Sequence, residues 1–278
     1  MIEVLQLEFM QRALIAGLLV SVGCGIIGTY VVVNRIVFIS GAIAHAAYGG
    51  IGLGYYLGIN PAVGAILFSL GAALGMGAVQ RRTRERADTI IGMMWAIGMA
   101  AGIVLVDLTP GYVVDLMSYL FGSILTVPWA DLLIMFLLDV VIVVLVVAFY
   151  KELLAISFDE TYASTANVRV DAIHVLLLCL VALTVVMLMR VVGLILVIAL
   201  LTMPAAIGGQ FTVDLKRMMV ISVLLGVVFT TVGLWLSYVL DLTSGATIIL
   251  TSTAGFLAAV LYKAVATHRP RSSYQGGD

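Results

Sequence analysis

Long apolar stretches follow one another along this chain from Phe9 to about Val265, and the short breaks between them carry most of its basic residues. Of the 278 residues, 63% are hydrophobic and only 10% are charged. A water-soluble domain of this size needs far more polar surface. Each apolar stretch is close to the roughly 20 residues that a helix needs to cross a bilayer. The pattern therefore predicts an all-α polytopic bundle of transmembrane helices, surrounded by a lipid bilayer.

About eight to nine spans are expected. Asn60 and Pro61 place a helix cap before a proline at a first helical position, which predicts a hairpin between the second and third spans. The stretch 111–127 is interrupted by an acidic residue and a glycine, which favours an interfacial or re-entrant helix. We assign residues 1–265 to one transmembrane domain and 266–278 to a polar, disordered tail. The nine apolar segments are 10–33, 37–58, 61–79, 90–107, 129–150, 171–189, 191–210, 218–240 and 244–265.

The basic residues orient these spans, because cytoplasmic loops carry an excess of Lys and Arg. With alternate breaks placed in the cytoplasm, 12 of the 14 basic residues fall there and only Arg12 and Arg190 remain outside. This predicts an outer N-terminus and a cytoplasmic C-terminus. Trp95, Trp129 and Trp235 are expected to anchor the helices at the membrane interfaces. The 12 cytoplasmic residues are Arg35, Arg81, Arg82, Arg84, Arg86, Lys151, Arg169, Lys216, Arg217, Lys263, Arg269 and Arg271.

Several function classes are excluded by what the sequence lacks. It has no phosphate-binding loop of the Walker type and no nucleophile–base pair that can be placed. Its one basic run, residues 81–86, lies between two apolar spans, unlike the basic stripe of a nucleic-acid-binding protein. We therefore expect a non-enzymatic membrane protein that binds no nucleic acid and keeps no permanent cofactor. Energy for any transport must come from a gradient or from another subunit.

His45 is the first candidate for a pathway residue. Gly41 and Gly49 lie four residues to either side of it, so the three share one helix face. Small residues on such a face indicate contact with protein or with a cavity. Because imidazole is a common ligand for zinc and other transition metals, His45 is a candidate metal ligand or gate. The alternative is a structural histidine that bonds to a neighbouring helix.

Asp139 and Pro204 are two further polar or irregular features inside the predicted spans. A carboxylate in the middle of a span is costly unless it is paired or hydrated, so Asp139 is either a cation site or a partner for a hydroxyl on another helix. Pro204 removes a backbone donor and is expected to break or kink its helix. Broken helices in transporters tend to line the pathway, whereas the alternative here is a tolerated kink.

Several stretches resemble, in the same order, the membrane permeases of ABC importers for zinc, manganese and iron. The resemblance is collinear over about residues 8–262, and the order and spacing of the motifs make it specific. The matching stretches are VVVNR at 31–35, AIAHA at 42–46, DTIIG at 88–92, VDLMSYLFG at 114–122 and VGLIL at 192–196, which runs on to MPAA at 203–206.

The resemblance implies a type II importer in a prokaryotic plasma (inner) membrane. Such an importer combines two permease subunits, here expected to be identical, with two cytoplasmic ATPase subunits that bind the ATP and an extracytoplasmic metal-binding protein. Residues 157–168 are similar to the family's coupling helix. The resemblance therefore implies that Phe158, Asp159, Glu160 and Tyr162 dock on the ATPase.

Gly41 departs from the family pattern, which usually has Asp four residues before the membrane His. Ser123 likewise replaces an Asp that often follows the Leu-Phe-Gly motif. Loss of a carboxylate weakens a site for a hard ion more than a nitrogen-rich site. We therefore expect import of a divalent metal by alternating access, with zinc favoured over manganese or iron. The alternatives are a gradient-driven secondary cation carrier, with His45 and Asp139 as relay groups, and an ABC permease for a metal chelate.

Overall fold

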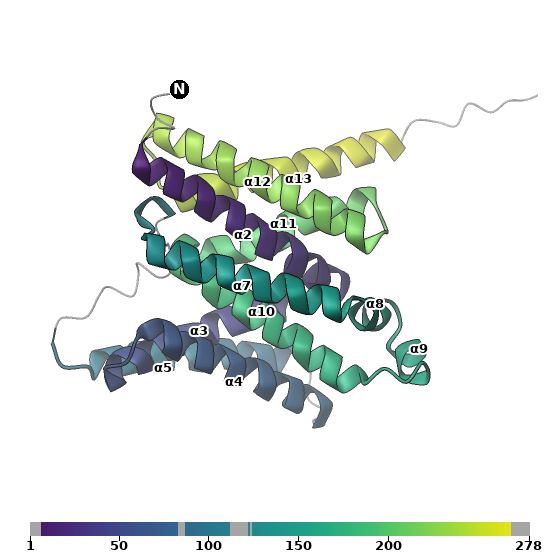
Figure 1. The fold of residues 1–278 in the computed structure, drawn as a ribbon, viewed down its shortest axis with the longest axis horizontal. Helices are drawn as coiled ribbons and strands as arrows, with labels where there is room; N and C mark the ends of the chain where they lie inside the picture. Colours follow the sequence, from purple (N-terminus) through teal and green to yellow (C-terminus); the bar gives the residue numbers. More distant parts are fainter. Residues whose placement is uncertain (1–6, 83–86, 112–121, 123, 268–278) are drawn as a thin grey trace, which may run out of the picture.

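Nine helices in the described part of the chain are long and apolar enough to cross a membrane (Figure 1). The computed structural model describes residues 7–82, 87–111, 122 and 124–267. The predicted all-α membrane bundle is confirmed, and each predicted span end lies within three residues of a helix end. The spans are α2 (Glu8–Val33), α3 (Val37–Leu57), α4 (Pro61–Arg82), α5 (Ala87–Asp107), α7 (Trp129–Ala148), α10 (Val170–Val192), α11 (Leu194–Phe211), α12 (Leu215–Leu240) and α13 (Ser244–Thr267).

A local sequence signal explains where α4 begins. Pro61 begins α4, and the side-chain oxygen of Asn60 accepts a hydrogen bond from the backbone of Ala62 at 2.9 Å, as the predicted cap requires.

Most of the segment 111–127 and of the tail 266–278 lies outside the described residues, as does Ser123. The predictions for these parts of the chain therefore remain predictions.

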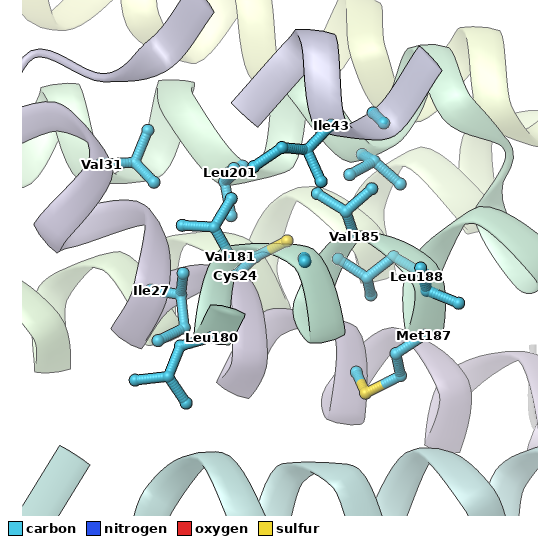
Figure 2. Packing of buried hydrophobic residues seen from close by; sticks show 14 of the residues in the cluster. Cys24, Ile27, Val31, Ile43, Leu180, Val181, Val185, Met187, Leu188 and Leu201 are labelled. Atoms are coloured by element: carbon cyan, nitrogen blue, oxygen red, sulfur yellow. The ribbon is translucent and has the colours of Figure 1, made fainter. Parts of the chain in front are cut away.

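The core forms where α10 packs among α2, α3, α4, α7 and α11 (Figure 2). Val185 of α10, Cys24 of α2 and Leu201 of α11 are almost completely buried, and Ile43 of α3 joins the same cluster. Lipid tails are as apolar as these side chains, so close packing rather than escape from water holds the helices together. Cys24 is therefore a small packing residue in the centre of the bundle.

Glycines allow α3 and α5 to approach each other at backbone contact. A Cβ added to Gly98 of α5 would lie 2.6 Å from the Cα of Ala46, and one added to Gly49 of α3 would lie 2.9 Å from the carbonyl oxygen of Gly98. Small residues at such crossings let membrane helices interlock. Of the most apolar 18 residues of each span, 83% are buried in α3 but only 11% in α5. The outer helix α5 therefore covers one side of the enclosed helix α3.

Of the two effects expected of Pro204, a break or a kink, the structure does not show a break. The helix α11 continues through it from Leu194 to Phe211. Proline removes one backbone donor, but packing against neighbouring helices makes this tolerable inside a membrane protein, and Pro204 is buried. The boundary between α10 and α11, predicted between 189 and 191, lies at Gly193, where φ is +77°. Glycine adopts this left-handed region without the clash that a Cβ causes.

The close crossing of α3 and α5 generates a stability prediction. We expect Gly98→Ala to lower the free energy of unfolding by about 1–3 kcal/mol, because its Cβ meets backbone that cannot yield. A matched control is Gly92→Ala on the same helix, where, apart from the neighbouring backbone of that helix, no atom of the described residues lies within 4 Å of the added Cβ. That change should be neutral or stabilising by up to about 1 kcal/mol. Thermal unfolding in detergent measures both, and equal effects would contradict the proposed packing.

Candidate functional site

His45 is enclosed between α3 and α5. Its side chain is buried, and its ring stacks on that of Trp95 with the centroids 3.9 Å apart. Its Nδ1 lies 3.0 Å from the sulfur of Met99. Trp95 and Met99 are four residues apart on α5 and so lie on one face of that helix. The arrangement places an imidazole nitrogen beside a thioether sulfur, which are both donors that softer transition metals accept.

Gly41 lies one turn before His45 and faces the same tryptophan. A Cβ at this position would be 3.5 Å from the Trp95 ring and 3.8 Å from Ile198 of α11, which is ordinary contact. The place that a carboxylate usually occupies in the resembled family is therefore bordered by an indole ring and an aliphatic side chain. Within the described ranges, no three His, Cys, Asp or Glu side chains gather into a metal-binding group.

Trp95 and Met99 are the site residues that sequence reasoning missed. The prediction that Trp95 anchors its helix at the membrane interface is wrong, because the side chain is partly buried and stacks on His45. One sequence signal could have pointed to them: Trp95 and Met99 are four residues apart on one predicted helix, and Gly98 on the same helix allows a neighbouring helix to approach closely. That spacing identifies a helix face, but it does not identify which other helix the face contacts.

Asp139 lies at a different interface, where α7 meets α2 and α10. Its side chain is 5% exposed. A Cβ added to Gly23 of α2 would lie 2.9 Å from its Oδ1. Neither carboxyl oxygen has a hydrogen-bond partner in the part of the chain that is described. The nearby Thr184 hydroxyl instead donates to the carbonyl of Leu180 at 2.8 Å. The structure therefore does not bring Asp139 together with His45, and a role for Asp139 in binding cations stays a prediction.

The segment predicted to be a coupling helix projects from the spans beside the end of α7 (Figure 1). It comprises the end of α8 (Tyr150–Phe158), then Asp159, then α9 (Glu160–Thr165), so its second helix is shorter than the range 157–168. Asp159 separates the two helices, because its extended backbone ends the first and its carboxylate caps the second. It accepts hydrogen bonds from the backbone of Thr161 at 2.8 Å and of Tyr162 at 3.0 Å.

Two aromatic side chains give this projection an apolar exposed surface. Phe158 is 65% exposed and Tyr162 is 67% exposed, on either side of the capping Asp159. Glu160 is also exposed. Exposed aromatic residues beside charged ones are typical of a surface that binds another protein. The four residues predicted to dock on a partner therefore lie together on one projecting segment.

A side-chain hydrogen bond joins this projection to the start of α3. Asn34 ends α2, and its Nδ2 donates to the Ser157 hydroxyl at 2.9 Å and to the carbonyl of Tyr30 at 2.8 Å. The turn that contains Asn34 leads directly into α3, which begins at Val37 and carries His45. The last turn of α8 is thus bonded to the turn that positions the His45 helix.

Known proteins match this chain over almost its whole length. The model of a family described as the ABC 3 transport family matches residues 6–263. The chain belongs to the ABC 3 transport family. It is therefore a multi-pass membrane permease subunit of an ABC transporter and is itself non-catalytic, as the sequence predicted.

Three relatives of this ABC 3 family chain illustrate the match. An uncharacterised membrane protein of Synechocystis is 56% identical, and the match covers 95% of this chain and 94% of that protein. The manganese transport system membrane protein MntC of Listeria monocytogenes is 35% identical, and the match covers 93% of this chain and 92% of that protein. The solved structure of PsaBC from Streptococcus pneumoniae in complex with Fab superposes with a TM-score of 0.84 at 33% identity, covering 93% of each chain.

Asp139 provides a test of whether this buried carboxyl is structural. We expect Asp139→Asn to leave the free energy of unfolding within about 1 kcal/mol of the wild type or to raise it, because the described residues give the carboxyl no hydrogen bond that the change could remove. Thermal unfolding of the purified permease measures the effect. A loss of several kcal/mol would mean that Asp139 has a partner and is part of the packing.

Proposed function

We propose that this ABC 3 permease carries a divalent transition-metal ion into the cytoplasm by ATP-driven alternating access. Family membership supports the use of a separate ATPase, and relatives named for manganese or metal transport support the class of cargo. His45 serves as a ligand or gate for the ion. Asp139 and Pro204 are proposed as further pathway residues, and Pro204 lies on α11, whose Ile198 borders Gly41.

The observation that carries the choice of ion is the pairing of His45 with Met99 beside Gly41. Imidazole suits zinc, a thioether suits soft ions, and manganese prefers carboxylate oxygen. Here the nitrogen of His45 lies 3.0 Å from the sulfur of Met99, while the position that usually supplies a carboxylate is glycine. We therefore propose zinc as the preferred cargo. Manganese, for which several relatives are named, is the competing candidate, followed by iron.

The proposed partners follow from the same family membership. They are a dimer of ATPase subunits, an extracytoplasmic metal-binding protein and a second copy of this permease. The distribution of basic residues supports an outer N-terminus and an inner C-terminus, which puts α8 and α9 in the cytoplasm. There the exposed Phe158 and Tyr162 form the ATPase dock, with Asp159 and Glu160 beside them.

The test of the function is uptake of radiolabelled zinc, manganese and iron by cells with and without the gene. The assay is repeated after ATP depletion with the proton gradient maintained. We expect gene-dependent uptake that ends when ATP is depleted and that is fastest for zinc. Uptake that survives depletion and follows the gradient would contradict an ABC importer, and preferential uptake of manganese would overturn only the choice of ion.

Variants in the same assay test the His45 site. We expect His45→Ala to reduce uptake at least about tenfold, the effect of losing roughly 1.4 kcal/mol of stabilisation, while assembly is retained. Met99→Leu keeps the side chain's volume but removes the sulfur, so it should lower the ratio of zinc to manganese uptake. Met93→Leu is the matched control, because Met93 lies on the same helix and is 57% exposed. Unchanged uptake by the His45 variant would remove this site from the pathway.

The bond between Asn34 and Ser157 is proposed to transmit movement of the ATPase dock to α3. Asn34→Ala and Ser157→Ala should each increase the ATP hydrolysed per ion transported in the reconstituted complex. The double variant should be no worse than Asn34→Ala alone, because that change already removes the bond to Ser157, together with the bond from Asn34 to the Tyr30 carbonyl. Ser164→Ala is the control, since its hydroxyl donates within α9, to the carbonyl of Thr161. Additive effects of the two single changes would contradict a shared route.

A further inference from the structure

A groove of about 840 Å³ runs along the membrane-spanning surface between α7 and α12. The helix α2 packs against both of these helices and lies between them in Figure 1, so it forms the floor. Ile26 of α2 lines the floor, Val147 lines the α7 wall, and Val220 and Leu224 line the α12 wall. The volume is near the upper end of the roughly 300–1,000 Å³ typical of small-molecule sites.

The walls of the groove are apolar and lie within spans. Val147 is 70% exposed, and Leu224 is 60% exposed. In a bilayer such side chains face hydrocarbon, so the groove opens toward lipid tails. A long apolar groove in this position fits an acyl chain better than it fits a polar solute.

One end of the groove is basic. Lys151 and Lys216 both line it. Lys151 follows the end of α7 at Ala148, and Lys216 is in the first turn of α12, which begins at Leu215, so the two lysines lie at the same membrane face. The Lys216 ammonium is 4.9 Å from the centre of the Tyr150 ring, an interaction that orients it at the groove.

The residues that line this end of the groove keep a net positive charge. Glu152 is the one carboxylate among the described residues that line the groove, against two lysines. Asp214 does not line the groove, and its carboxylate points back to its own helix, where it caps α12 and accepts a hydrogen bond from the backbone of Arg217 at 2.9 Å. The pKa of Tyr150 is raised, first by burial and second by the charge of Asp214, so its hydroxyl remains a neutral donor.

We propose that this groove binds an anionic phospholipid. Its phosphate lies against Lys151 and Lys216, and one acyl chain lies over Ile26 between α7 and α12. A basic residue near the membrane surface attracts anionic lipid, whereas a zwitterionic headgroup brings no net charge to the lysines. The site is separate from His45 and does not depend on the proposed transport function.

The test is native mass spectrometry of the full-length permease in detergent. The probes are phosphatidylglycerol and phosphatidylcholine with identical acyl chains. We expect phosphatidylglycerol to bind about tenfold or more tightly, since each lysine contributes roughly fivefold. The double variant Lys151→Gln/Lys216→Gln should lose this preference. Lys263→Gln is the matched control, because this lysine is on α13 and does not line the groove. Equal binding of the two lipids, or an equal loss in the control, would overturn the proposal.

A second variant tests the apolar half of the site. Ile26→Trp fills the floor of the groove and should abolish retention of phosphatidylglycerol, with unfolding followed to verify the fold. If that variant fails to fold, Val220→Trp on the exposed wall replaces it. Inorganic phosphate should not displace the lipid, and displacement would identify a free-anion site instead. Disulfide cross-linking between copies through Val147→Cys would show that this face is an interface between copies and would also overturn the proposal.

Discussion

Every backbone polar group within the spans must find its partner in the protein, because hydrocarbon offers none. This constraint makes the chain helical from one membrane face to the other. It also governs the small polar side chains, which bond back to their own helix. Ser21 donates to Gly17, Thr29 to Gly25 and Ser252 to Ile248, each one turn earlier. A few buried side chains in the described part of the chain depart from this pattern, among them the hydroxyls of Tyr30 and Ser69, and Asp139 is the one carboxylate of this group, with neither oxygen bonded.

Helices whose backbone hydrogen bonds are satisfied internally associate in a membrane through close packing, and glycines make that packing possible here. Gly49 and Gly98 let α3 and α5 meet at backbone contact, which encloses α3 while α5 remains on the outside. The same crossing brings Trp95 and Met99 over His45. Packing and the character of the candidate metal site therefore have one cause, because a larger residue at the crossing would separate the imidazole from the thioether.

The helix α2 contacts several of the functional parts described above. At its end, Asn34 links the turn before α3 to Ser157 on the projecting segment. Along the outer side of α2, Ile26 forms the floor of the groove between α7 and α12. The helix α2 therefore contacts the segment proposed to meet the ATPase, the proposed lipid and, through the core, Leu201 of α11. Its low exposure and its many small residues fit this central position.

The sequence by itself determined the class of protein, the nine spans and their approximate ends, because hydropathy and helix caps are local properties that act over one or two turns. Its motifs also identified the family. The tertiary structure decided what His45 touches, since Met99 is 54 residues away on another helix and no local rule selects that partner. It also separated Asp139 from His45, kept α11 continuous through Pro204 and divided the projecting segment at Asp159. These outcomes depend on which helices pack together, and that is set by the fit of whole surfaces rather than by any one residue's preference.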